Sequence, residues 1–139
     1  MDPNNPIVKL CAQGIEAEAV GEPTKARELF DQAWSAASDD WERCVAAHYV
    51  ARHQDTPEAT LHWNEVCLRY ADAVGDERVA GFYPSLYLNI GHSRETLGER
   101  DLAAAAYTKA ERALGTVPPG PYADMVRDGV ARGLERVRG

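Results

Sequence analysis

The sequence has few of the features that mark secreted, membrane or metal-binding proteins. Its three cysteines, Cys11, Cys44 and Cys67, are odd in number, far apart and outside any Cys-x-x-Cys motif, so neither a disulfide framework nor a zinc site is indicated. No apolar run approaches the ~20 residues that a bilayer-spanning helix needs, and the amino terminus has neither a basic nor an apolar signal region. We therefore predict a cytoplasmic protein with reduced thiols, no membrane association and no cofactor.

Positive charge is also scarce. The 15 Lys and Arg residues are outnumbered by 22 Asp and Glu residues, which gives a net charge of −7. Binding to phosphate backbones needs a clustered excess of basic residues. The richest basic stretch, 127–138, has Asp128 and Glu135 at spacings that suit helical ion pairs, which is typical of a solvated helix face. Nucleic acid is therefore not an expected partner.

Helical periodicity is present along almost the whole chain. The stripe Ala26, Leu29, Phe30, Ala33 and Trp34 has the spacing of one helix face, and no segment alternates as a strand does. Turn residues, among them Gly and Pro, interrupt the pattern at short intervals. The sequence predicts an all-α fold with helices over residues 7–20, 23–37, 40–53, 57–74, 78–97, 101–114 and 121–137.

Pro84 lies inside the fifth predicted helix and leaves two interpretations open. Either the helix begins there, with Pro84 in its first turn, or it is longer and kinked after Gly81-Phe82-Tyr83. The periodicity does not decide between them.

One spacing pattern occurs three times along the chain. A small residue is followed after twelve positions by Ala, then by an aromatic residue and another small residue, a pattern that suits two helices in close contact with an aromatic ring filling the space beside them. The second and third copies stand further apart than the first two, and we expect the extra residues to lengthen the fourth and fifth helices. The copies are Gly14, Ala26, Phe30, Ala33; Ala47, Ala59, Trp63, Val66; and Gly91, Ala103, Tyr107, Ala110.

At these residues the chain resembles the tetratricopeptide repeat family, whose units are helix-turn-helix hairpins that stack into a right-handed superhelix. The third copy is nearest to the family pattern, through residues 87–91 and 97–103. The resemblance implies a single domain over residues 1–139, a right-handed α-solenoid with repeats over about 7–39, 40–74 and 78–117 and a capping helix over about 121–138. An irregular helical bundle is the structural alternative.

The resemblance also implies a function: an adaptor or regulatory module that binds a protein or peptide in a concave groove lined by the first helix of each hairpin. Asn89 belongs to an aromatic segment that either packs in the core or grips a peptide. The predicted partner-binding residues are Trp41, His48, Arg52, Ser85, Leu88, Asn89, His92 and Glu95.

Two other functions compete with this one. Gly129 and Gly133 permit a close helix crossing, so a homodimer through the last helix is the alternative to a cap. A metal site can be considered from Cys44, His48 and His92, and a catalytic thiolate pair from Cys44 and His48. We expect neither a bound metal nor a catalytic residue, because a fourth ligand and a phosphate-binding or oxyanion motif are lacking in the sequence.

Overall fold

The computed structural model describes residues 2–139. Within this range the chain forms seven α-helices and three short 3₁₀ helices, and no strand. The all-α prediction is therefore confirmed. The α-helices are α1 (Pro6–Ala19), α2 (Pro23–Ala36), α3 (Asp40–Val50), α4 (Pro57–Val74), α5 (Tyr83–Thr96), α6 (Arg100–Ala113) and α7 (Pro121–Arg138), and the 3₁₀ helices are η1 (Ala51–His53), η2 (Ala80–Phe82) and η3 (Leu114–Thr116).

Caps and prolines set where the helices begin. The side chain of Asn5 accepts a hydrogen bond from the N–H of Ile7 at 2.8 Å and so satisfies a free donor at the start of α1. Pro23, Pro57 and Pro121 are the first residues of α2, α4 and α7. The first turn tolerates proline because its missing N–H has no partner there. The helix starts could therefore be predicted to within a few residues.

The start of α5 settles the question that Pro84 raised. The helix begins at Tyr83, with Pro84 in its first turn. The prediction that both α4 and α5 are lengthened was half right: α4 has 18 residues, but α5 has 14. The remaining extra residues form a connection over 75–82, because Gly75 takes a left-handed backbone with φ 63° that ends α4.

The first and third hairpins share one turn geometry. Gly21 follows α1 with φ 77°, and Gly98 follows α5 with φ 78°. In both turns the N–H of the next residue donates to the carbonyl five positions earlier, at 2.8 and 2.9 Å. These bonds satisfy carbonyls that the helix end leaves free, and the positive φ favours glycine. The repetition read from the sequence is thus also present in the backbone.

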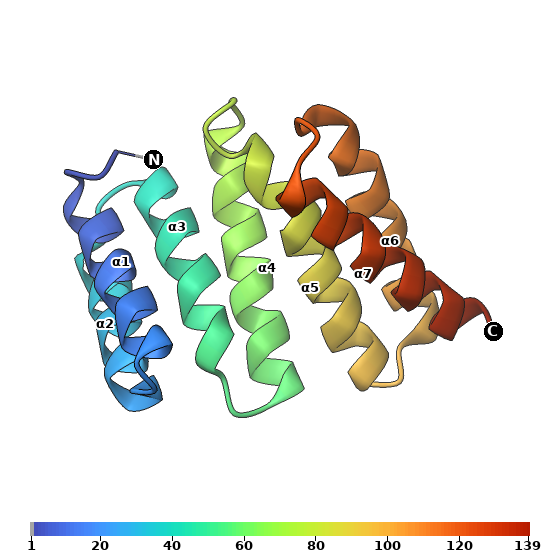
Figure 1. Cartoon of the computed structure of the whole chain (residues 1–139), viewed down its shortest axis with the longest axis horizontal. Coiled ribbons are helices and arrows are strands. Elements are labelled where there is room, and N and C mark those ends of the chain that lie inside the picture. Colours follow the sequence, from blue (N-terminus) through green and yellow to red (C-terminus); the bar gives the residue numbers. More distant parts are fainter. Residues whose placement is uncertain (1) are drawn as a thin grey trace.

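The helices form a stack of antiparallel hairpins (Figure 1). The hairpins α1–α2, α3–α4 and α5–α6 follow one another in a row, α7 packs against α5 and α6, and the two termini lie at opposite ends of the molecule. Three apolar clusters fill the hairpins and their junctions, and the Trp34 and Trp63 side chains contact two of them. None of the helices in residues 2–139 combines the length and apolarity that a bilayer span requires.

The predicted contacts between small and aromatic residues are present in the first and third copies of the pattern. A Cβ atom at Gly91 would lie 2.5 Å from Cε1 of the fully buried Tyr107, and Gly14 stands in the same relation to Phe30. Ala103 and Ala26, the alanines of the same two copies, are 0% exposed. The pattern therefore marks the places where paired helices approach most closely.

The last helix covers the end of the third hairpin. Gly133 lies against the hydroxyl-bearing end of the Tyr107 ring, and Gly129 lies against Leu88. The apolar stripe of α7, which includes Val126 and Val130, belongs to the same core cluster as Tyr107. The helix therefore completes the core of the third hairpin.

Candidate functional site

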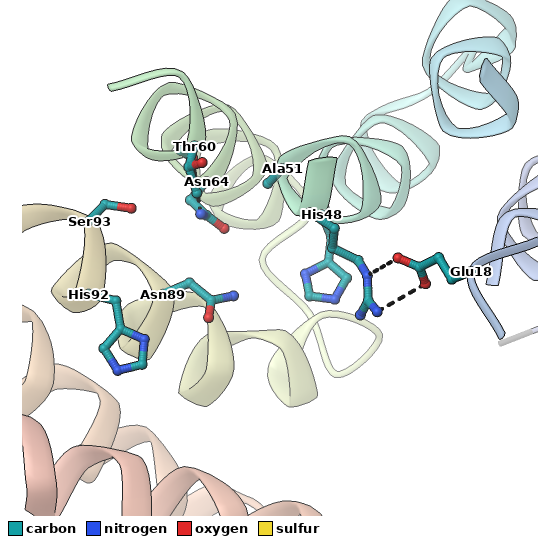
Figure 2. A pocket seen from close by; sticks show the side chains of 9 residues that line it. Glu18, His48, Ala51, Thr60, Asn64, Asn89, His92 and Ser93 are labelled. Carbon is teal, nitrogen blue, oxygen red and sulfur yellow. Dashed lines mark hydrogen bonds and ion pairs between the residues drawn. The ribbon is translucent and has the colours of Figure 1, made fainter. Parts of the chain in front are cut away.

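A single pocket takes its lining from all three hairpins. It has a volume of about 420 Å³ and lies where α1, α3, η1, α4 and α5 approach one another (Figure 2). We call it the central pocket. Its lining residues are Glu18, His48, Ala51, Arg52, Thr60, Asn64, Asn89, His92 and Ser93.

The rim of the central pocket carries a paired set of charges. Arg52 donates two hydrogen bonds to the Glu18 carboxylate, at 3.0 and 3.1 Å, and His53 Nε2 lies 2.6 Å from the same group. Partial burial opposes ionisation of Glu18, but these hydrogen bonds lower its pKa below the ordinary value. The carboxylate and the guanidinium thus largely neutralise each other, and they join the first hairpin to the second.

His48 is an uncharged wall of the central pocket. Its ring packs edge-on against Tyr49 and Phe82, with centroids 5.1 and 5.4 Å apart. Burial, aided by the positive charge of Arg52, lowers the pKa of His48 to about 4. The imidazole is therefore neutral at physiological pH. Its Nδ1 atom is buried without a hydrogen-bond partner.

The floor of the central pocket is polar and incompletely hydrogen-bonded. Asn64 is 1% exposed; its amide nitrogen donates to the Thr60 carbonyl at 3.0 Å, while its Oδ1 atom has no partner. A buried acceptor left in this state costs about 1–3 kcal/mol. Asn89 and Ser93 also direct side chains into this space (Figure 2). The floor thus offers several neutral hydrogen-bonding groups to a ligand.

Four of the eight predicted binding residues line the central pocket. They are His48, Arg52, Asn89 and His92. His92 is exposed and stands edge-on to the Tyr107 ring, with centroids 5.8 Å apart. The structure therefore brings together predicted residues from the second and third hairpins.

Leu88 and Glu95 lie under or beside α7, away from the central pocket. Leu88 is 7% exposed and contacts Gly129. Glu95 receives hydrogen bonds from Arg136 at 2.7 Å and from the Tyr107 hydroxyl at 2.7 Å. The hydrogen bond from Arg136 is the largest cause of a lowered pKa at Glu95; burial opposes it, and the Tyr107 hydroxyl lowers the pKa further. These two side chains hold the last helix in place. The sequence had predicted that they face the groove.

Ser85 and Trp41 are also placed elsewhere. The Ser85 N–H donates to the hydroxyl of Tyr122 at 3.2 Å, and that hydroxyl donates to the Gly81 carbonyl at 2.6 Å. Ser85 thus ties the start of α7 to the start of α5. Trp41 packs against two core clusters, and its indole Nε1 atom is buried without a partner. It is half-buried against the core, whereas the resemblance placed it among the groove residues.

The three residues considered for a metal site or an active site, Cys44, His48 and His92, do not form one cluster. Cys44 is buried in the core, where its Sγ atom lies 3.8 Å from that of Cys67, while His48 and His92 line the central pocket. Hydrogen bonding to Cys44 and burial raise the pKa of the Cys67 thiol. Residues 2–139 contain no group of three or more His, Cys, Asp or Glu side chains arranged to hold a metal ion.

The glycines considered for a homodimer face the chain's own core. Gly129 contacts Leu88, and Gly133 contacts Tyr107. A second copy can reach this face only by displacing α7. The surface proposed for self-association is therefore already occupied within the molecule.

Comparison of the chain with family models, curated proteins and solved structures found no match.

The predicted binding residues leave out five of the nine residues that line the central pocket: Glu18, Ala51, Thr60, Asn64 and Ser93. Thr60 and Asn64 lie on α4, the second helix of its hairpin, and the expected groove used first helices only. Ser93 lies on α5 beside His92. A signal for Asn64 was present: it stands at three-residue spacing between the buried Leu61 and Cys67. A polar residue inside an apolar stripe marks either a buried hydrogen bond or a binding group.

A second hollow differs from the central pocket in its lining. It has a volume of about 470 Å³, and its floor is formed by apolar side chains of α4 together with Leu97, under a charged rim. It takes no residue from the first hairpin. We call it the side hollow; it is lined by Glu58, Leu61, His62, Glu65, Val66, Arg69 and Leu97.

The neutral state of His48 predicts a pH-dependent stability. Its folded-state pKa is lowered to about 4 from an ordinary value of 6.5, so the unfolded chain binds a proton at a higher pH than the folded chain does. The stability that this residue contributes is complete above pH 6.5 and is lost as pH falls towards 4. Between pH 7 and pH 5 we expect a loss of about 2 kcal/mol in the free energy of unfolding, measured by urea titration.

Two variants distinguish the contribution of His48 to this pH dependence from the contributions of other residues. His48→Gln should remove most of the loss between pH 7 and pH 5, because no proton is taken up at that position on unfolding. His62→Gln, at an exposed position of α4, should keep the wild-type dependence. Equal pH dependence in wild type and His48→Gln would contradict the burial of a neutral imidazole.

Proposed function

We propose that this chain is a protein–protein interaction module, built as a tetratricopeptide-like stack of hairpins, that binds an extended peptide segment of a partner across the central pocket. The observation that carries the proposal is that one pocket takes residues from all three hairpins. A peptide in extended form advances ~3.3 Å per residue and so reaches across neighbouring helices, which lets a single ligand contact residues of all three hairpins.

The chemistry of the central pocket supports the same class of ligand. Its centre offers amide, hydroxyl and neutral imidazole groups, and its charged rim pair is internally compensated. Such a lining suits the alternating N–H and C=O groups of a peptide better than it suits a phosphate or a metal ion. The net charge of −7 also disfavours nucleic acid. The proposal includes no catalytic step and no cofactor.

The compartment proposed for this module is the cytoplasm. The odd number of cysteines in the sequence supports a reducing environment, because paired structural disulfides are typical of oxidising compartments.

Selection from a random peptide library displayed on phage tests the proposal. Immobilised wild-type protein should enrich peptides that bind with micromolar affinity when synthesised. The variant Asn89→Trp fills the central pocket with an indole and should weaken that binding by at least about tenfold. It should fold normally, because Asn89 is half-buried and its side chain is not used in any hydrogen bond of residues 2–139.

The matched control is Arg69→Trp, which adds the same indole to the side hollow. Affinity should stay within about twofold of wild type. Peptides that bind wild type and Asn89→Trp equally well, or that lose affinity only with Arg69→Trp, would refute the central pocket as the binding site.

A further inference from the structure

The orientation of the Asn64 amide is fixed by its neighbour. The Thr60 carbonyl accepts hydrogen bonds and cannot donate, so the nitrogen of the Asn64 amide has to face it, at 3.0 Å. The Oδ1 atom is therefore left on the side of the central pocket, where it has no partner. Figure 2 shows the Asn64 and Asn89 side chains directed into the same space from α4 and α5. Asn64 thus presents a buried acceptor that a ligand can satisfy.

The surroundings of this acceptor are uncharged. His48 is neutral at physiological pH, and Asn89 and Ser93 carry no charge. The charges that face the pocket are Glu18 and Arg52, which pair with each other; the exposed His92, whose pKa is lowered by partial burial and by Arg136, is neutral as well. A carboxylate of the ligand would meet the Asn64 oxygen unfavourably, and an ammonium group would find no unpaired anion.

From this geometry we infer that the central pocket binds the backbone amide of an internal stretch of peptide, whose N–H donates to Asn64 Oδ1 and whose C=O accepts from the Asn89 amide. The inference rests on the proposed function and specifies its ligand. A trans backbone amide points its N–H and C=O in opposite directions, so it can bridge two carboxamides that belong to different helices. No hydrogen bond in residues 2–139 holds the side chain of the half-buried Asn89, so its amide group is available to a ligand.

The test uses a peptide selected on wild-type protein as described under Proposed function. It is synthesised with free ends and with acetyl and carboxamide ends, and then with a single N-methyl group at each backbone nitrogen in turn. Blocking the ends should change the affinity by less than about threefold. One N-methyl position should weaken binding by at least about tenfold, because it removes the N–H that Asn64 accepts.

Asn64→Leu then identifies the acceptor. This variant should bind the unmodified peptide at least about tenfold more weakly, and the critical N-methyl group should cause no further loss beyond about twofold. Its urea midpoint should equal or exceed that of wild type, since the variant buries a side chain with no unsatisfied oxygen. A merely structural asparagine predicts the opposite, a lower midpoint with unchanged peptide affinity in the folded fraction.

Asn89→Leu keeps the inference testable if α4 does not tolerate leucine at position 64. This variant should bind the unmodified peptide at least about tenfold more weakly than wild type does, while its urea midpoint stays unchanged. A peptide that depends on the central pocket but loses its affinity when its carboxyl end is blocked would overturn this inference alone. A library without any peptide that depends on the central pocket would overturn the proposed function, and this inference with it.

Discussion

Gly91→Val is expected to unfold the third hairpin. A Cβ atom at this position would lie 2.5 Å from Cε1 of Tyr107, and the ring cannot move away, because Gly133 of α7 closes on it and Tyr107 is fully buried. Overpacking a core contact typically costs ~1–3 kcal/mol. The space beside Gly91 does not admit even a Cβ atom, and valine adds two methyl groups beyond it. We therefore expect a loss of at least about 3 kcal/mol in urea unfolding, with the near-ultraviolet circular dichroism of Tyr107 diminished.

Two further variants make this result specific to the Tyr107 contact. Gly115→Val is the control, since a Cβ there meets no atom within 4 Å, and it should leave stability within about 1 kcal/mol of wild type. Gly91→Val combined with Tyr107→Leu should cost less than the sum of the single changes, because Tyr107→Leu removes the ring that the new valine would strike, and the valine fills part of the space that the ring leaves. Strict additivity would mean that Gly91 and Tyr107 are not in contact.

Val130→Asp should detach α7 from the third hairpin. Val130 is 1% exposed and packs in the cluster that contains Tyr107 and Leu134. A carboxylate at this place has no cation to pair with inside the cluster, and burying an unpaired charge is among the few mechanisms that cost more than about 4 kcal/mol. We expect a large fall in urea midpoint, together with rapid hydrogen exchange in α6 and α7.

The neighbouring position provides a matched control. Ala131 is exposed on the same helix, and Ala131→Asp introduces the same charge one residue further on. Its free energy of unfolding should stay within about 0.5 kcal/mol of wild type. If the two variants behave alike, α7 is not the cap described here, and its apolar stripe is then available for another copy of the chain.

Local sequence signals were sufficient to predict the helices. Prolines at helix starts, glycines at helix ends and the helical spacing of apolar residues each act within a few positions of the chain, so no tertiary information is needed to read them. The predicted length of α5 was wrong because the start of this helix does not follow from local signals alone. Pro84 permits two starts, and the choice of Tyr83 depends on how residues 75–82 cross from α4.

The candidate site was only partly predictable because its residues depend on how helices pack. His48, Arg52, Asn89 and His92 line the central pocket, as the position of each on its helix suggested. Glu95 lies on the same helix as His92, one turn later, yet it is held by Arg136. Contacts between α5 and α7 decide which residues of α5 are covered. The sequence of α5 alone does not reveal these contacts.

Asn64 illustrates the reverse case. Its position in an apolar stripe is a signal of burial that the predicted binding set did not use, and the structure shows that burial leaves one oxygen without a partner. Neither the spacing of residues in α4 nor the resemblance to a repeat family distinguishes a structural asparagine from a ligand-binding one. The distinction arises only when α5 brings Asn89 and Ser93 into the same pocket.

The most direct test of peptide binding in the central pocket is a map of backbone amide resonances by nuclear magnetic resonance while a selected peptide is added to ¹⁵N-labelled wild-type protein. The account predicts that the largest shifts fall on the residues around His48, Asn64, Asn89 and His92. Shifts confined to α7, or to Leu61, Val66 and Leu97 of the side hollow, with the central pocket undisturbed, would contradict it.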